Sequence, residues 1–381
     1  MRGDSLYWPA CAGFALALAT VTTLTAHRVW GACAAVGYAV AAVLTRRTPH
    51  HRRRAAALVA AVGAVVLPLA VLMVTGVAQA EVGVVQHSAE LLLDTGSPYA
   101  PYPRAVHDFN PYLPGMALLG TAHVVLGDFP LADARFWFAA VFFVSLLLAA
   151  RHPRTGTRTA AGGGALTNAL LLIAGFPAVA LPLAVGGVDL PVIGLMCLGL
   201  SLAGRRHDSR TTSGPVAGLV MGAAAALKWT AWPLLPVALT LLAVTAGRRA
   251  AMRAAFTALT VAVLAIVPSA LVDPHAFVEN VVLFPLGAGG VGSPATSPLP
   301  GYLLATYVPG GRAISVAALL LSAVGVGASL IVRPPRTVVA AADRLAMGLG
   351  LAMCLMPATR FGYLVYPLLL MVWFRRAHRM T

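Results

Sequence analysis

The sequence is 381 residues long, with 59% hydrophobic and only 10% charged residues. Soluble domains carry roughly 25% charged residues, so the composition excludes an ordinary soluble protein and indicates a polytopic membrane protein. The net charge of +15 does not indicate nucleic-acid binding, because the basic residues lie in short clusters between apolar segments. The four cysteines lie inside apolar segments without CxxC spacing, so we predict neither a disulfide framework nor a metal site.

The first third of the chain sets the predicted topology. Apolar segments at about 8–26, 29–45 and 55–79 each approach the length of roughly 17–25 residues that spans a bilayer. A basic run at 46–54 separates the second segment from the third. Because positively charged loops stay in the cytoplasm, we predict a cytoplasmic N-terminus. The polar loop after the third span, residues 80–133, is then extracytoplasmic.

The segment 111–127 within this loop is apolar enough to resemble one more span. If it crossed the membrane as 134–150 does, the next basic run, 151–158, would lie outside, against the positive-inside rule. We therefore predict that 111–127 forms a juxtamembrane helix and that only 134–150 crosses.

The remaining apolar segments extend this pattern to about twelve spans with both termini in the cytoplasm. They lie at 165–185, 190–204, 214–246 (split into a helical hairpin), 254–272, 313–332, 341–357 and 361–374. We predict a single all-α membrane domain over residues 1–381, with a second external loop at 273–311. Most of the twelve acidic residues then lie outside. Since acidic residues contribute little to orientation, this asymmetry indicates that the chemistry is extracytoplasmic.

Glu81 directly follows the third span, at the start of a predicted helix. Helical spacing places it on an apolar side with Val85, whereas Glu90 and Asp94 share a polar stripe. A carboxylate held against apolar groups suits a general base near neutral pH. The alternative is that Glu81 only stabilises the positive end of the helix dipole. Asp94 is either a helix-end residue or a substrate contact.

Other polar and aromatic residues on the predicted external side are candidate contacts for a substrate. The tyrosines form either an interfacial aromatic belt or a surface on which a sugar stacks. The candidate substrate-binding residues are Asp94, Tyr99, His107, Asp108, Tyr112 and Asp189.

Five features follow one another along the chain. They are an acidic residue just outside a span, A-x-LLL-x-TGSPYAP, FNPYLPGMALL, GVDLP and AGLVMGAAAALKWTAWPLLP. From about Val77 to Thr240, this order resembles glycosyltransferase family 87, which has the multi-span GT-C architecture. The family includes mycobacterial polyprenol-phosphate-mannose-dependent mannosyltransferases. The resemblance implies that Glu81 is the catalytic base, at a position where the family usually has aspartate. It also implies that Asn110–Pro114 corresponds to a Tyr-Pro-Pro-like segment.

The resemblance implies inverting transfer of a hexose, most often mannose, from a polyprenyl-phosphate donor to a lipid or cell-envelope glycan acceptor. Such a donor carries its own anionic leaving group, and the sequence shows no Gly-rich nucleotide-binding fingerprint, so we expect no cofactor. Glu81 would deprotonate the acceptor hydroxyl while an external cation stabilises the released phosphate. The candidate cations are Lys228, Arg360 and Arg104. For Lys228 and Arg360, the alternative is snorkelling to lipid headgroups.

Two other classes of protein fit a polytopic chain: a secondary transporter or lipid flippase, and a non-catalytic membrane scaffold. A transporter typically carries ionisable residues or broken helices near mid-membrane in matching halves. Here the ionisable residues lie at the predicted outer ends, and the sequence shows no half-repeat. We therefore favour the enzyme, with membrane lipids and a lipid-linked sugar as its partners and no nucleic acid.

Overall fold

A computed structural model describes residues 3–47, 53–127, 129–151, 163–205, 213–287, 291–292 and 294–379. Within these ranges the chain forms helices and no strand, with one isolated parallel bridge between Thr296 and Thr359. The predicted all-α class is confirmed. Parts of three predicted cytoplasmic basic runs (48–52, 152–158 and 206–210), together with Asp128, lie outside the described residues.

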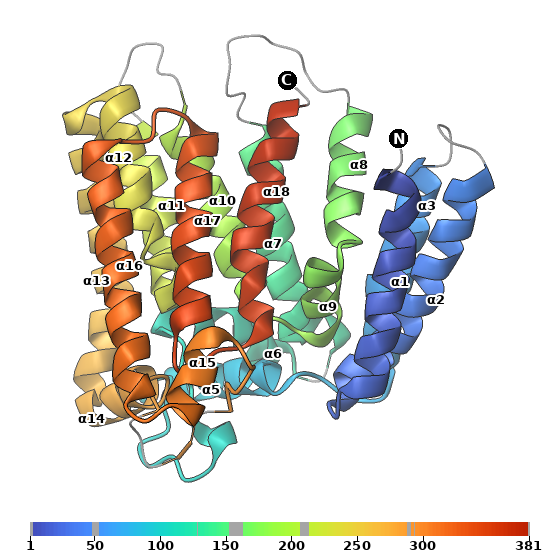
Figure 1. The fold of residues 1–381 in the computed structure, drawn as a ribbon. Helices are drawn as coiled ribbons and strands as arrows, with labels where there is room; N and C mark the ends of the chain where they lie inside the picture. The colour runs from blue at the N-terminus through green and yellow to red at the C-terminus, as the bar shows by residue number, and fades with distance from the viewer. Residues whose placement is uncertain are drawn as a thin grey trace.

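The long helices run side by side, and short helices gather at one end of the bundle (Figure 1). The α-helices are α1 (Gly3–Val21), α2 (Thr25–Arg47), α3 (Arg53–Ala61), α4 (Leu67–Val74), α5 (Ala80–Thr95), α6 (Thr121–Leu126), α7 (Ala134–Ala150), α8 (Gly163–Ala174), α9 (Pro177–Val185), α10 (Asp189–Ala203), α11 (Ser213–Leu227), α12 (Leu234–Ala246), α13 (Arg248–Val272), α14 (Pro274–Val278), α15 (Pro300–Tyr307), α16 (Gly311–Val332), α17 (Val338–Leu355) and α18 (Val365–Arg379). The π-helical turns are η1 (Val62–Val66) and η6 (Glu279–Leu283), and the 3₁₀ turns are η2 (Val106–Asp108), η3 (Pro114–Gly120), η4 (Pro130–Ala132), η5 (Trp229–Ala231) and η7 (Phe361–Leu364).

By length and composition, six helices among the described residues can span a bilayer, or seven if α8 and α9 form one broken span. Shorter apolar helices run beside them (Figure 1), at Leu6–Val21, Ala134–Ala150, Asp189–Ala203, Gly214–Leu227 and Phe361–Arg375. A helix therefore lies at each predicted span, and the polytopic membrane architecture is confirmed.

The segment 111–127 does not run through the bundle. Its two short helices, η3 and α6, lie at the same end as α5 (Figure 1), in agreement with the predicted juxtamembrane position. The packing of η3 on α5 is close, because a Cβ added at Gly120 would lie 2.4 Å from the carbonyl oxygen of Val85. Both chain ends lie at the opposite end of the bundle.

The predicted span 165–185 is broken, because α8 and α9 meet at an angle of 74°. The break follows from the sequence Gly175-Phe176-Pro177. Proline disfavours the helical conformation of the residue before it, and Phe176 is extended, with φ −75° and ψ 125°. As a result, α9 ends at Gly186 beside the start of α5.

A second irregularity lies in the continuous helical segment α3–η1–α4, at the point where this segment is bonded to α2. Pro68 has no N–H to donate to the carbonyl oxygen of Ala64, four residues earlier. Trp30 Nε1 donates to that oxygen instead, over 2.8 Å. The π-helical turn η1 lies at this point. The Ala64 carbonyl that Pro68 leaves free thus accepts a hydrogen bond that links α2 to this helix.

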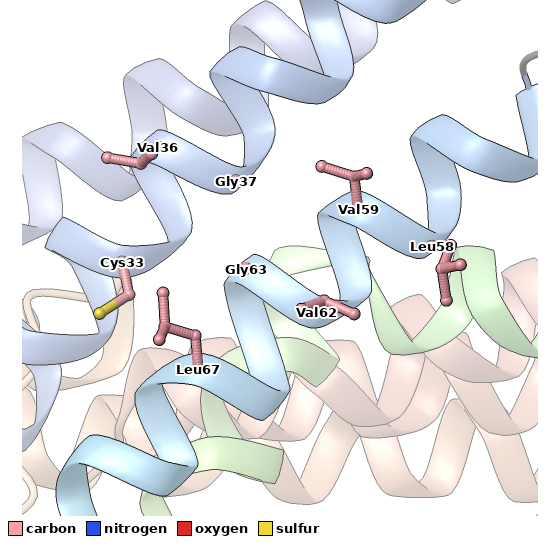
Figure 2. A pocket seen from close by; sticks show the side chains of 8 residues that line it. All are labelled: Cys33, Val36, Gly37, Leu58, Val59, Val62, Gly63 and Leu67. Atoms are coloured by element: carbon pink, nitrogen blue, oxygen red, sulfur yellow. The ribbon is translucent and has the colours of Figure 1, made fainter.

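An apolar groove of about 300 Å³ lies between α2 and the α3–η1 segment (Figure 2). It is lined by Cys33, Val36, Gly37, Leu58, Val59, Val62, Gly63 and Leu67. Val36 and Leu58 are exposed, so the groove opens toward the surroundings of the bundle. None of its lining residues is charged, and the polar chemistry lies elsewhere.

Helix α11 packs tightly on α13 through glycines spaced four residues apart. A Cβ added at Gly218 would lie 2.3 Å from the carbonyl oxygen of Ala254, and one at Gly222 would lie 2.6 Å from that of Ala258. Small residues let membrane helices approach until their backbones touch. This contact leaves no room for even one methyl group.

We expect Gly218→Ala to destabilise the protein by about 1–3 kcal/mol, because the added methyl group pushes α11 away from α13. The control is Gly325→Ala in α16, where an added Cβ meets nothing within 4 Å. That change should be neutral or stabilise by up to about 1 kcal/mol through helix propensity. Thermal unfolding of detergent-solubilised protein measures both. Equal Tm values for the two variants would contradict the close packing.

Candidate active site

Two ion pairs meet at the end of the bundle that carries α5. Glu81, in the first turn of α5, accepts a hydrogen bond from Nη1 of Arg360, which precedes η7. Lys228, in the connection between α11 and α12, donates from Nζ to Oδ1 of Asp189 at the start of α10 over 2.6 Å. Four residues that are distant in sequence, all predicted site residues, are thereby brought together.

Tyrosines surround the Lys228–Asp189 pair. Tyr366 donates its hydroxyl hydrogen to Oδ1 of Asp189 over 2.7 Å. The ammonium of Lys228 lies 4.8 Å from the ring centroid of Tyr363 and 5.4 Å from that of Tyr112, within range of a cation–π interaction. The side chains of Lys228 and Asp189 are only 10% and 14% exposed. This pair is therefore a buried ion pair with a polar and aromatic shell.

The two ion pairs act on each other electrostatically. Burial by itself lowers the pKa of Lys228, but Asp189, Tyr363 and, more weakly, Glu81 together outweigh it, so that the pKa is raised. Burial likewise opposes the charge of Arg360, but Glu81 and, more weakly, Tyr363 and Tyr112 together outweigh it and raise the pKa. Burial, followed by Glu81, raises the pKa of Tyr112. Both cations thus stay charged, and the Tyr112 phenol stays neutral.

The start of α5 is held in place by a buried arginine. Arg135 forms a two-pronged ion pair with Asp133 over 2.9 and 2.7 Å, and its Nη1 donates to the carbonyl oxygen of Val77 over 3.2 Å. The N–H of Gln79 donates to the carbonyl oxygen of Val185 over 2.9 Å. These bonds fix the backbone just before Glu81 and thereby direct its side chain.

Gly186 makes this arrangement possible at the end of α9. Its φ of +100° is a conformation that favours glycine. A Cβ here would lie 2.2 Å from the side chain of Val82 and 3.0 Å from that of Arg135. Only glycine lets α9 approach α5 this closely.

The second predicted external loop supports Arg360. The N–H of Thr359 donates to the carbonyl oxygen of Ala295 over 2.9 Å, and the N–H of Ser297 donates to that of Thr359 over 2.9 Å. The N–H of Phe361 donates to the hydroxyl of Ser297 over 3.1 Å. The residues on both sides of Arg360 are therefore tied to this loop.

Tyr112 is positioned by a polar clamp between the two predicted external loops. Buried Asn280 accepts the N–H of Asn110 over 2.8 Å, and Asn110 in turn accepts the N–H of Tyr112 over 3.0 Å. Tyr99 donates its hydroxyl hydrogen to the carbonyl oxygen of Tyr112 over 3.0 Å. Tyr99 is buried against Phe277, so it supports Tyr112 from within the protein.

The structure does not bring the other predicted residues to this cluster. Asp94 is exposed in the last turn of α5. Asp108 accepts the N–H groups of Ala105 and Arg104 over 2.8 and 2.9 Å, and these bonds lower its pKa. His107 is 81% exposed and lies 3.3 Å from Asp108. Arg104 is also exposed, so these residues form an outer turn of their own.

Sequence reasoning missed three residues of the cluster. Tyr363 and Tyr366 follow Arg360 at intervals of three, a spacing that places residues on one face of a helical turn and could have identified them. His27, in the first turn of α2, lies within electrostatic range of Glu81 and Arg360. Its Nδ1 is buried and has no hydrogen-bond partner among the described residues. No sequence signal distinguished this histidine.

The fold and this site define a polytopic membrane protein with a cluster of paired charges at one end of its helix bundle. The family model of glycosyltransferase family 87 matches residues 110–357. The match covers more than half of the chain, and the protein belongs to this family of membrane glycosyltransferases. Comparison with curated proteins and with solved structures found no match. Tyr112, Asp189 and Lys228 lie inside the matched range.

We expect Asp189→Asn to destabilise the protein by about 3–5 kcal/mol, because it leaves the buried Lys228 ammonium without its counter-charge. The double variant Asp189→Asn/Lys228→Gln removes both charges together and should recover much of this loss. Tm and the yield of monodisperse protein in detergent measure both changes.

The matched control is Asp343→Asn, which removes one partner of an ion pair whose side chains are 54% and 37% exposed. An exposed pair contributes at most about 1 kcal/mol, so this variant should resemble the unsubstituted protein. If Asp189→Asn is as mild as Asp343→Asn, the Lys228–Asp189 pair does not stabilise the fold.

Proposed function

We propose that this glycosyltransferase moves a hexose, for which mannose is the favoured candidate, from a polyprenyl-phosphate donor to a lipid or cell-envelope glycan acceptor. The observation that carries the proposal is the meeting of Glu81 with Arg360 beside the Lys228–Asp189 pair. A carboxylate and cations in one partly buried site are what transfer from an anionic leaving group needs. The apolar helices around the site would hold the lipid tail of the donor near the membrane.

In the proposed reaction, the acceptor oxygen attacks the anomeric carbon from the side opposite the phosphate, so that the configuration inverts. The new carbon–oxygen bond forms as the bond between sugar and phosphate breaks. Glu81 takes the proton of the acceptor hydroxyl, and the electron pair of the broken bond leaves with the polyprenyl phosphate. The positive charges of Arg360 and Lys228 stabilise the negative charge that develops on that phosphate.

The neighbouring polar residues would hold the two substrates. Asp189 would accept hydrogen bonds from sugar hydroxyls through Oδ2, because Lys228 and Tyr366 bind its Oδ1. Tyr112 is only 5% exposed, so it would contact the sugar through a small part of its ring. Arg104, in the outer turn, stays a candidate for the donor phosphate. His107 and Asp108 in the same turn, and Asp94 at the end of α5, stay candidate substrate contacts. Tyr99 acts through Tyr112, whose backbone it holds.

We propose that the cluster faces the extracytoplasmic side and that both termini are cytoplasmic. The two chain ends lie at the end of the bundle opposite α5 and α15 (Figure 1). This arrangement supports a location of the termini on one side of the membrane and of the cluster on the other. The positive-inside rule assigns the side with the basic runs to the cytoplasm.

Topology reporters fused after Thr95 and within residues 273–311 should therefore report an external location. Fusions at Arg206 and Arg376 should report the cytoplasm and serve as controls for insertion. A cytoplasmic signal at Thr95 would place the cluster on the wrong side for an extracytoplasmic donor.

Glu81→Gln preserves size and hydrogen bonding but cannot accept a proton, so we expect turnover to fall about 10²- to 10⁴-fold. Glu81→Asp should retain part of the activity, since it keeps the carboxylate. The assay supplies membranes with radiolabelled polyprenyl-phosphate mannose and follows the label into lipid or glycan products.

The control for this experiment is Glu90→Gln on the same helix, because Glu90 is 45% exposed and pairs with His87. It should change turnover little. Near-normal turnover of Glu81→Gln, with loss in Asp189→Asn at normal protein levels, would move the base to Asp189. If the membranes transfer no mannose at all, the proposed donor is wrong.

A further inference from the structure

Each acid of the cluster already has a cation as its partner. Arg360 is bound to Glu81, and Lys228 is bound to Asp189. An anionic phosphate that enters the cluster therefore meets cations that are already paired. To form a direct hydrogen bond with either cation, the phosphate must share it with a carboxylate or displace that carboxylate. The two ion pairs differ in how readily this can happen.

Lys228 is the less available cation. Its side chain is 10% exposed, its ammonium lies within 5.4 Å of the centroids of two tyrosine rings, and the ammonium is 2.6 Å from Asp189. Asp189 is held further by Tyr366, whose hydroxyl also receives the hydroxyl hydrogen of Thr230 over 2.9 Å. Moving Lys228 would leave a carboxylate that is 14% exposed without its counter-charge, which is costly.

Arg360 is the more available cation. Its side chain is 35% exposed, and its bond to Glu81 uses Nη1. A guanidinium has five N–H donors in a planar fork, a shape that binds phosphate through two parallel hydrogen bonds.

We propose that Arg360 captures the donor phosphate and releases Glu81 as it does so, while Lys228 stays bound to Asp189. This inference rests on the proposed function and adds an order of events to it. Before the donor binds, Oε1 of Glu81 accepts the hydrogen bond from Arg360, so this oxygen is not open to an acceptor hydroxyl. After the donor binds, Glu81 is free to take the proton of the acceptor. The donor must then bind before the acceptor is activated.

Labelling of Glu81 by dicyclohexylcarbodiimide tests the exchange without any turnover. This reagent reacts with carboxyl groups in apolar surroundings, and a carboxylate that an arginine holds in an ion pair, as Arg360 holds Glu81, reacts poorly with it. We expect labelling of Glu81 in the purified full chain, followed by mass spectrometry, to rise several-fold when a polyprenyl phosphate is added. Uncharged polyprenol should have no effect, and labelling of Glu90 should not change.

Two variants separate the roles of the cations. In Arg360→Gln, labelling of Glu81 should be high from the start and should not respond to polyprenyl phosphate. In Asp189→Asn/Lys228→Gln, which keeps a neutral pair, the response should persist. A response that survives in Arg360→Gln, or that is lost in a folded double variant, would overturn the assignment to Arg360. Circular dichroism and monodispersity establish that each variant is folded.

Inorganic phosphate at the same concentration distinguishes a lipid-linked ligand from a free anion and should have less effect than polyprenyl phosphate. An equal effect would overturn the assignment to a lipid-linked donor. Unchanged labelling with polyprenyl phosphate would overturn the exchange itself, even if the membranes transfer mannose normally. Failure of the transfer assay, by contrast, would count against the proposed donor sugar and not against the exchange.

Discussion

The pairing of buried charge is the constraint on which the architecture of the site depends. An isolated charge at membrane depth is costly, and a buried ion pair is tolerated only with good geometry and further hydrogen bonds. The Lys228–Asp189 pair meets this requirement through Tyr366 and two aromatic rings. The ends of α10 and α11 must therefore lie where these side chains can meet, and the second pair is built beside them.

The loops at this end of the bundle are supports for the site, and they are not passive connections. The clamp between Asn110 and Asn280 joins the two predicted external loops in the interior of the protein. The bridge at Thr359 joins the second of these loops to the residue before Arg360. A buried backbone needs such partners for its polar groups, and here the same bonds set the position of a tyrosine and an arginine.

Much of the fold could be predicted because long apolar segments have few alternatives in a membrane. The sequence indicated Glu81 by its place after a span, and Lys228 and Arg360 by their charge at helix ends. It could not indicate which acid pairs with which cation, because that depends on contacts between distant helices. The 74° break between α8 and α9 was missed although Gly175 and Pro177 signal it, since overall hydropathy continues across both residues.

One ion pair of the site lies inside the range that the family model matches, and the other lies outside it. The matched range, 110–357, contains Lys228 and Asp189, whereas Glu81 precedes it and Arg360 follows it. Both flanking segments are nevertheless tied to the matched range by backbone hydrogen bonds, Gln79 to Val185 and Thr359 to Ala295. The position at which Glu81 meets Arg360 is therefore set by the matched range, although neither residue belongs to it. A change in either of those two backbone contacts would displace one partner of the Glu81–Arg360 pair and leave the Lys228–Asp189 pair in place.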